Sequence, residues 1–460
     1  MYHVDQSAAK TVSHLSDLRS ALDGELHLPG DPGWDDVRRA WQLTVDQRPS
    51  AVVIAGSVAD IEVTVRAALR LGLRVAPQAT GHGAGAIVSL RNAILLRTDR
   101  LNEVSVDATR MTARAEAGAQ WKDVVGLAAE HGLAAASGSS PDVGVVGYTL
   151  GGGLGWIGRS HGLAANSVLA IELVDATGVL RRVDAQHDED LFWAARGGVV
   201  TGVVTAIEFR LYPIPELCAG SLMWPIDRAA DVVDRWREWI ADVPVSVTSL
   251  ARVLRYPALP ELPPFLQNRS FVAVEAAIQE DAEAAAKLLA PLRALEPEID
   301  TMRMMPPSEL GSVHGDPPNP VPAYGDAIML AELSAEAVDA FVSSAIADES
   351  APLLSVELRH LGGELAPARG EGGAVAGLAG EGIVYIVGIA PVPDAAAAVA
   401  AAADRVVAAL RPWQSARAYR NFAERPTSAD ALYGDAAPRL RRIVAQWDPD
   451  SVFCTAHALR

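Results

Sequence analysis

One short stretch of this chain carries an unusual density of glycine. Residues 138–155 read GSSPDVGVVGYTLGGGLG and contain seven glycines. Glycine costs roughly 0.5–1 kcal/mol relative to alanine inside a helix or strand, because it loses more backbone freedom on folding. A cluster this dense predicts a loop shaped around a ligand, such as a cofactor, that approaches the main chain closely. A plain turn-rich connection is the alternative.

The length and charge of the chain limit its classes of function. At 460 residues, the chain is long enough for two or three domains of roughly 150 residues each. Its 39 basic and 57 acidic residues give a formal net charge of −18, which would repel nucleic acid and anionic lipid. The apolar runs stay shorter than the roughly 18 residues of a membrane helix. We therefore expect small molecules as partners, and neither nucleic acid nor a membrane.

Cysteine content and the first residues bear on metal binding and location. Cys218 and Cys454 are the only cysteines, which excludes a disulfide framework and a multi-cysteine metal cluster within one chain. We predict no metal site. The opening residues MYHVDQSAAKTVSHL lack the basic and then apolar segments of a secretory signal, so a cytoplasmic location is the expectation. The oligomeric state is left open.

The hydrophobic pattern predicts an α+β protein. Apolar spacing in the first half predicts strands at 50–55, 73–77, 93–96, 104–106, 112–117 and 203–214, helices at 58–72, 121–131 and within 188–198, and a hairpin turning at Thr177 and Gly178. From about 219 to 412, alanine-rich helical stretches (274–295, 334–348, 393–410) alternate with strands at 271–278 and 355–361. Residues 312–326 hold four prolines and two glycines and predict a long irregular loop of the kind that lines active sites.

His82 is a candidate functional group. It follows a predicted strand in the sequence QATGHGAGA, where glycines at 81, 83 and 85 leave the imidazole uncovered. A neutral imidazole nitrogen is a competent nucleophile near physiological pH. The alternative is a histidine that only makes hydrogen bonds. The glycine-rich run matches neither a phosphate-binding P-loop nor a dinucleotide fingerprint, because the required lysine and glycine spacing are missing.

Four ordered motifs resemble the berberine bridge enzyme-like flavoproteins of the vanillyl-alcohol oxidase fold group. They are TGHG at 80–83, SSPDVGVVGYTLGGGLGWIGRSHGLAANS at 139–167, DLFWAARGG at 190–198, and the ending that starts with YRNFAERP at 419–426. The resemblance implies a PCMH-type two-part FAD-binding domain over 1–214, with its core at about 45–215. A substrate domain with a helix-covered sheet would span 215–414, and residues 415–460 would complete the FAD domain.

The resemblance also implies the cofactor and its contacts. FAD would be joined covalently through its 8α carbon to His82, and backbone amides of the glycine-rich segments would hold its pyrophosphate. The implied FAD-binding residues are His82, Gln78, Ala79, Thr80, Gly81, Gly83, Gly138, Ser139, Ser140, Pro141, Gly144, Gly147, Thr149, Gly151, Gly152, Gly153, Asn166, Val204 and Asn421.

Three departures from the family pattern change what the resemblance implies. Ser140 stands where many members carry a cysteine that makes a second flavin bond, so we expect one covalent link. The segment RGGVVTG at 196–202 is shorter than its family counterpart and lacks an Asn-Phe pair. Phe422 replaces the tyrosine that serves many relatives as catalytic base, and phenylalanine cannot take a proton.

A base must then come from elsewhere, and Glu357 in SVELRHLGG is the first candidate. On an alternating strand Glu357 shares a face with Arg359, and His360, a weaker candidate, lies on the other. An exposed ion pair is the alternative reading. Tyr324 is the third predicted catalytic residue. We expect further pocket-lining side chains at Asp326, His314 and Tyr419.

The function implied by the resemblance is oxidation of an alcohol, a sugar or a secondary-metabolite intermediate. A hydride would pass to flavin N5, and O2 would take the electrons to give H2O2. The alternatives are a flavin dehydrogenase with another electron acceptor and a flavin-binding protein without turnover.

Overall fold

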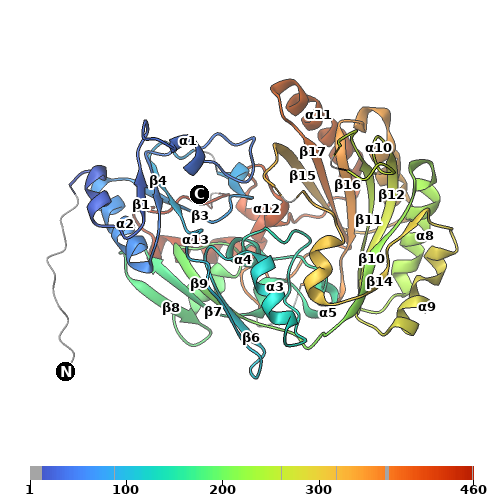
Figure 1. Cartoon of the computed structure of the whole chain (residues 1–460), viewed down its shortest axis with the longest axis horizontal. Helices are drawn as coiled ribbons and strands as arrows, with labels where there is room; N and C mark the ends of the chain where they lie inside the picture. Colours follow the sequence, from blue (N-terminus) through green and yellow to red (C-terminus); the bar gives the residue numbers. More distant parts are fainter. Residues whose placement is uncertain are drawn as a thin grey trace.

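The structure is a computed structural model that describes residues 13–87, 89–260, 262–317, 319–367, 372–457 and 459. Figure 1 shows two halves side by side. One half holds two small sheets made by the first part of the chain and the last helices. The other half holds one large sheet with helices along its outer side.

The first small sheet has the order β1-β2-β4-β3. Its strands are β1 (Glu25–His27), β2 (Ala51–Ile54), β3 (Arg74–Gln78) and β4 (Ala93–Arg97). β4 runs parallel to both β2 and β3, so helix α2 (Val58–Leu71) forms the crossover between parallel strands. Ser57 caps α2 at its start by accepting from the Asp60 amide, and Gly72 ends it in the left-handed conformation. The short helix α1 (Trp34–Val37) precedes β2.

The second small sheet is antiparallel, with the order β5-β6-β9-β7-β8. Its strands are β5 (Val104–Asp107), β6 (Thr112–Glu116), β7 (Val168–Asp175), β8 (Leu180–Asp184) and β9 (Gly202–Arg210). Its helices are α3 (Trp121–Ala129), α4 (Val145–Leu150), α5 (Gly158–His161), α6 (Ala164–Ser167) and α7 (Glu189–Ala195). The predicted hairpin is confirmed as β7 and β8.

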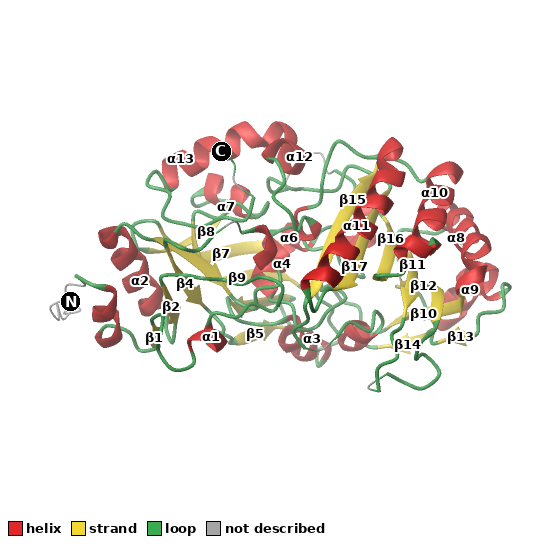
Figure 2. Cartoon of the chain, turned by 90° about the horizontal axis from the view of Figure 1, so that it is seen from above, coloured by secondary structure: helices red, strands yellow, loops and turns green. Residues whose placement is uncertain are grey.

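The large sheet is antiparallel and follows the order β13-β10-β12-β11-β16-β17-β15, with β14 paired to β10. Its strands are β10 (Leu217–Pro225), β11 (Val247–Arg255), β12 (Ser270–Ile278), β13 (Ile299–Asp300), β14 (Arg303–Met305), β15 (Ala323–Leu330), β16 (Leu353–His360) and β17 (Gly382–Ile389). Helices α8 (Ala229–Asp242), α9 (Ala282–Arg293), α10 (Ala335–Ile346) and α11 (Pro393–Leu410) cover one face, as Figure 2 shows from above.

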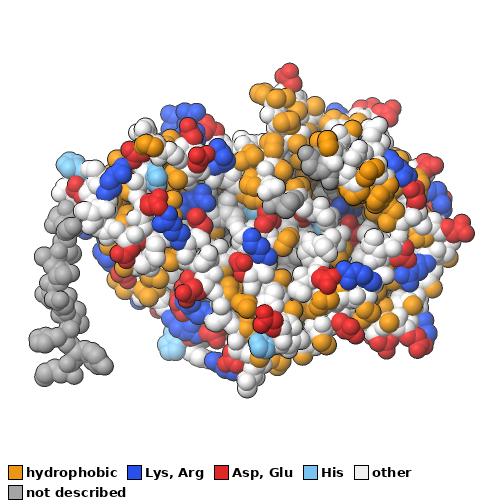
Figure 3. Space-filling model, in the orientation of Figure 1, with side chains coloured by type: hydrophobic (Ala, Val, Ile, Leu, Met, Phe, Trp, Pro, Cys, Tyr) orange, Lys and Arg blue, Asp and Glu red, His pale blue; other side chains and the backbone are white. Residues whose placement is uncertain are grey.

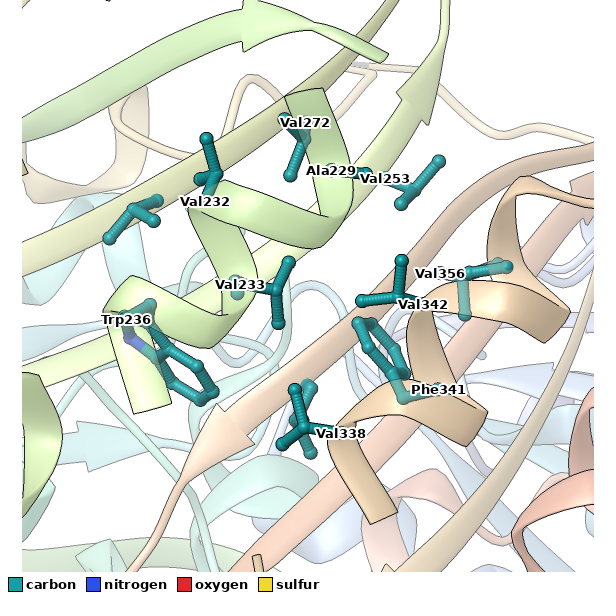
Figure 4. Close-up of a cluster of buried hydrophobic side chains, with 14 of the residues drawn as sticks. Ala229, Val232, Val233, Trp236, Val253, Val272, Val338, Phe341, Val342 and Val356 are labelled. Atoms are coloured by element: carbon teal, nitrogen blue, oxygen red, sulfur yellow. The ribbon is translucent and has the colours of Figure 1, made fainter. Parts of the chain in front are cut away.

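Alternation along these strands gives the sheet two different faces. Val253 and Val356 point to the helices and join a buried core with Trp236 and Phe341 (Figure 4). The residues next to these valines along each strand point the other way, towards the first half of the molecule. Because the helices seal only one face, this second face is free to form the wall of a site.

The end of the chain returns to the first half. Helices α12 (Ala429–Tyr433) and α13 (Ala437–Trp447) pack on the second small sheet. Beyond them, Phe453 bridges to Val75 of β3, and Arg74 donates to the Phe453 carbonyl at 2.7 Å.

The predicted boundary at residues 214 and 215 falls between β9 and β10.

Three predicted elements differ from the structure. The glycine-rich run is not all loop, because Val145 and the residues after it form α4. The predicted irregular loop 312–326 is shorter, since β15 begins at Ala323 and Pro318 lies outside the described residues. In the predicted helix 274–295, the residues up to Ile278 pair in the sheet and the helix begins only at Ala282, because burial between two strands outweighs the helical spacing.

Basic and acidic side chains are interspersed on the face of the molecule in Figure 3, and hydrophobic side chains gather around the alanine-rich α11. Within the described ranges, no helix is both long and apolar enough to cross a bilayer.

The helix-covered core predicts a large effect for one tryptophan. Trp236 is fully buried, and its indole donates to Ser249 at 3.1 Å, so Trp236→Ala leaves a cavity and an unpaired hydroxyl. We expect a loss of about 3–5 kcal/mol in unfolding free energy, measured by urea titration. Arg235→Ala, on the exposed side of the same helix, is the control and should change stability by less than about 0.5 kcal/mol. Equal effects of both variants would contradict this packing.

Candidate active site

His82 lies in a tight loop directly after β3. Gly81 permits the turn with a φ of +86°, where a β carbon would come within 2.9 Å of the Ala40 side chain. The His82 ring stacks on Trp41 with a centroid distance of 4.1 Å and an angle of 18°. Its Nδ1 lies 2.8 Å from the Thr80 hydroxyl, whereas its buried Nε2 has no hydrogen-bond partner among the described residues.

The environment of His82 keeps its ring neutral. Burial lowers the pKa of His82 to about 4, although the nearby Asp142 and Asp316 oppose this shift. At neutral pH the ring therefore carries one proton. With that proton on Nδ1 and donated to Thr80, the Nε2 lone pair is free to act as a nucleophile.

The glycine-rich run meets the His82 loop. Asp142 accepts a hydrogen bond from the Trp41 indole at 2.7 Å and lies 3.9 Å from His82 Nε2. Gly144 faces Ala79, whose side chain would lie 3.5 Å from an added β carbon. Segments about sixty residues apart in sequence thus form the two sides of one small site.

The glycines of the run are required mainly by protein side chains. A β carbon on Gly151 would fall 1.8 Å from the Asn421 side chain, and one on Gly152, which has a φ of +127°, would fall 2.8 Å from Tyr419. By contrast, the β position of Gly147 in the run, like that of Gly83 beside His82, faces open space apart from the adjoining backbone. The C-terminal segment therefore occupies the space next to Gly151 and Gly152, and a ligand held by the rest of the run stays a prediction.

The polar atoms of this region fit a bound FAD. Several predicted FAD-binding side chains place a buried polar atom without a partner among the described residues, namely Gln78 Nε2, His82 Nε2, Thr149 Oγ1 and Asn166 Oδ1. Buried polar groups are normally hydrogen-bonded in proteins, so these unpartnered atoms are available to a polar ligand. FAD offers phosphates, hydroxyls and a heteroaromatic ring to these atoms.

The other predicted FAD contacts lie around the same loops. Gly138 and Gly153 pack against the Tyr148 ring, and Pro141 packs against Gly311. Val204 is different, because its side chain is buried in the core of the second small sheet. Only its backbone could reach a ligand.

A network of buried charges lines the free face of the large sheet. Glu357 accepts from Arg359 Nε at 2.7 Å and lies 3.1 Å from His314 Nε2. The other ring nitrogen of His314 lies 2.6 Å from Glu275, which pairs with Arg252 at 3.2 Å. The predicted pairing of Glu357 with Arg359 is confirmed, and the pair is buried rather than exposed.

These charges set one another's protonation. Burial and Arg252 lower the pKa of His314, but Glu275, Asp316 and Glu357 outweigh them and raise it to about 9. Burial alone would raise the pKa of Glu357, yet Arg359 and His314 hold it far below its ordinary value. Glu357 is therefore a weak proton acceptor that fits the orientation of Arg359 better than proton abstraction. Its role as a base stays a prediction.

Asp316 links this network to the FAD-side loops. Its carboxylate accepts a hydrogen bond from the Ser140 hydroxyl and lies 3.5 Å from that of Ser139. His314 Nε2 is 3.9 Å from the same carboxylate group. Ser140 thus contacts the opposite half of the molecule through its oxygen.

The other predicted catalytic residues lie outside the ion pairs of this network. Tyr324 packs against the helix-side core, with the Arg425 guanidinium 5.2 Å from its ring centroid, so the structure does not bring it to Glu357. Asp326 pairs with Arg425 at 3.1 Å. His360 lines a small pocket with Arg359 and Trp156 between the two halves.

Sequence reasoning missed several residues that meet at the site. Trp41 and Asp142 flank His82, and Tyr385 and Glu424 lie beside Phe422. Period-two alternation along residues 382–389 could have placed Tyr385 on the free face. Nothing local in the sequence points to Trp41, because its contact with His82 depends on the tertiary fold.

Comparisons with known proteins agree with this geometry. A family described as "FAD binding domain" matches residues 49–184, and one described as "Berberine and berberine like" matches residues 418–460. The chain carries both domains of the berberine bridge enzyme-like flavoproteins. The predicted family and the PCMH-type α+β fold are thereby confirmed, and FAD is the cofactor that this domain binds.

Individual relatives support the same assignment. The chain is 34% identical over 206 residues to (R)-6-hydroxynicotine oxidase of Paenarthrobacter nicotinovorans, covering 44% of this chain and 45% of the relative. It is 32% identical over 202 residues to glucooligosaccharide oxidase of Sarocladium strictum, covering 43% and 40%. These matches span less than half the length of each relative.

Solved structures extend the likeness of fold to nearly the whole chain. Physcomitrella patens BBE-like 1 superposes with a TM-score of 0.83 at 19% identity, covering 97% of this chain and 100% of that one. The 6-hydroxy-D-nicotine oxidase of Arthrobacter nicotinovorans gives 0.82 at 23% identity, covering 98% and 100%.

The buried network predicts a pH-dependent stability. The pKa of His314 is raised from 6.5 to about 9, so its ion pairs stabilise the fold fully below pH 6.5 and lose this effect as pH rises through about 9. The midpoint of urea unfolding should fall over this range in the wild type and fall less in His314→Gln. His360→Gln is the control, because burial lowers the pKa of His360 to about 3 and keeps it neutral throughout. Identical slopes for wild type and His314→Gln would contradict the network.

Proposed function

We propose that this chain is an FAD-dependent oxidoreductase whose flavin is linked covalently to His82 alone. One observation carries the proposal: the neutral His82 presents a buried, unpartnered Nε2 within the FAD binding domain. When bound, FAD would accept a hydride from an organic substrate and pass the electrons to O2, which would leave as H2O2. We further propose that it acts in the cytoplasm.

The residues around His82 are arranged for bond formation. Thr80 holds the ring by its Nδ1, and Trp41 fixes the ring plane by stacking. Both contacts reduce the orientations that Nε2 can adopt before it reacts. Asp142, 3.9 Å away, would stabilise positive charge that develops on the imidazole. Because Ser140 carries a hydroxyl held by Asp316 instead of a thiol, a second, thioether link to the flavin is not expected.

The substrate would bind between the two halves, next to the charged face of the large sheet. The buried ion pairs of this face compensate one another, so they would orient a neutral substrate rather than attract an ion. Relatives named for the oxidation of 6-hydroxynicotine and of glucooligosaccharides support an alcohol, a sugar or a secondary-metabolite intermediate. O2 and this small molecule would be the partners.

A dehydrogenase is the second candidate. The pollen allergen Phl p 4 has the same fold with a TM-score of 0.80 at 17% identity and is described as having glucose dehydrogenase activity. Anaerobic mixing with 6-hydroxynicotine, a glucooligosaccharide and benzyl alcohol, followed by O2 or an artificial dye, separates the two. Reoxidation by dye alone would favour the dehydrogenase, and flavin that no compound bleaches would favour a binding protein.

Covalent attachment is tested by mass. The acid-denatured wild type should carry the added mass of one FAD. His82→Ala should lose that mass because it lacks the nucleophile, while Ser140→Ala should keep it as the matched control. Flavin released entirely from the denatured wild type would refute the link, and retention in His82→Ala would place it elsewhere.

The contacts of the imidazole also predict which nitrogen reacts. Since Thr80 occupies Nδ1 and Nε2 is unpartnered, the flavin peptide released by proteolysis should be the Nε2-linked isomer, as identified by NMR. Thr80→Val should slow attachment, because the proton is no longer held on Nδ1. An Nδ1-linked peptide from the wild type would show that the loop rearranges when flavin binds.

A further inference from the structure

Tyr385 lies on the free face of the large sheet, in the same row as the charged network. On β17 it pairs directly with Glu357 of β16 on one side and with Ala327 of β15 on the other. Glu357 in turn pairs with Arg252 of β11. Cross-strand partners point to the same side of a sheet, so the Tyr385 phenol faces the FAD-binding half and not the helices.

Glu424 holds the phenol of Tyr385. The hydroxyl donates to Glu424 Oε1 at 2.5 Å, and the other carboxylate oxygen accepts from the Gly325 amide at 3.1 Å. A β carbon at Gly325 would fall 2.2 Å from Glu424 Oε1 and 2.8 Å from the Tyr385 hydroxyl. The pair thus needs a glycine on the neighbouring strand.

Phe422 connects this pair to the flavin-side segment. The Tyr385 and Phe422 rings stack at 4.3 Å and 23°, and Phe422 meets the edge of Tyr419 at 5.0 Å. The Arg359 guanidinium lies 5.2 Å from the Phe422 centroid. At the position where the family pattern has a tyrosine, this chain therefore has the apolar ring of Phe422, which packs against the phenol of Tyr385 from β17.

The geometry points to Tyr385 and Glu424 as a proton relay for the oxidation that we propose above. The substrate hydroxyl gives its proton to the Tyr385 oxygen, while the Tyr385 proton passes to Glu424 Oε1. The substrate carbon that bears this hydroxyl gives its hydride to FAD. The substrate thus loses one proton and one hydride, FAD gains two electrons, Glu424 becomes protonated, and Tyr385 is neutral before and after the step.

The surroundings suit this division of roles. Burial raises the pKa of Tyr385 well above 10, and the Glu424 carboxylate raises it further, so the phenol is a relay and not a stable anion. Burial also raises the pKa of Glu424 above 4.5, which makes it a better proton acceptor than Glu357. The other titratable or polar groups that act on the pair are Glu357, Asp316, Asp326 and Gln42.

Two conservative variants test the relay in the FAD-loaded enzyme. Tyr385→Phe keeps the stacking on Phe422, and Glu424→Gln keeps an acceptor oxygen for the phenol. Each should lower the rate of anaerobic flavin reduction about 10²–10⁴-fold, with FAD content and melting temperature unchanged. Tyr212→Phe is the control, because Tyr212 packs against His161 and not against a carboxylate, and it should react like the wild type.

The pH profile separates a relay from a merely structural role. In the wild type, the rate should fall at acidic pH with a midpoint above 4.5, since protonated Glu424 cannot accept a proton. Glu424→Gln should abolish this limb. If the wild type reduces its flavin but Tyr385→Phe matches its rate and profile, the relay is wrong while the proposed function stands.

A spectroscopic titration tests the pair without a substrate. Phenolate absorbance of the wild type minus that of Tyr385→Phe reports this phenol alone. Glu424→Gln should lower the pH at which the phenol ionises, because it removes a neighbouring negative charge. An unchanged midpoint would overturn the pairing even if no compound of the panel bleaches the flavin, an outcome that would count separately against the proposed substrate class.

Discussion

Close contact between the glycine-rich run and the C-terminal segment is the constraint on which the site depends. Asn421 and Tyr419 fill the space that side chains at Gly151 and Gly152 would otherwise occupy. Asn421 donates to the Tyr148 carbonyl at 2.8 Å, and the Leu154 amide donates to the Tyr419 hydroxyl at 2.9 Å. This segment also carries Phe422 and Glu424. The same contact therefore fixes the position of Glu424, the proposed proton acceptor, relative to the glycine-rich run.

The large sheet supplies the opposite wall through its two unlike faces. Valines pack under the helices, and the alternate positions carry Arg252, Glu357, Arg359 and Tyr385 towards the FAD-binding half. Buried ion pairs add little net stability, but removing one partner is costly because the other charge is left unpaired. The network therefore fixes the geometry of this wall, and Asp316 ties it to Ser140 across the site.

Sequence reasoning reached the features that depend on local pattern. The glycines around His82, the helical spacing of 58–72 and the strand face that Glu357 shares with Arg359 are all visible within a few residues. It could show that Phe422 removes a tyrosine, but not that Tyr385 lies beside it. That proximity depends on the strand order β16-β17-β15 and on the return of the C-terminal segment to this sheet. Both are set by long-range contacts that local periodicity does not encode. For the same reason Tyr324, two strands from Glu357, appeared closer to the site than it is.

The most direct test of the account is a crystal structure of the flavin-loaded protein. We expect continuous electron density from His82 Nε2 to the flavin ring and no bond to Ser140. The ring should lie between the glycine-rich run and the face that carries Glu357 and Tyr385. Flavin density that is separate from His82, or that lies away from this face of the sheet, would contradict it.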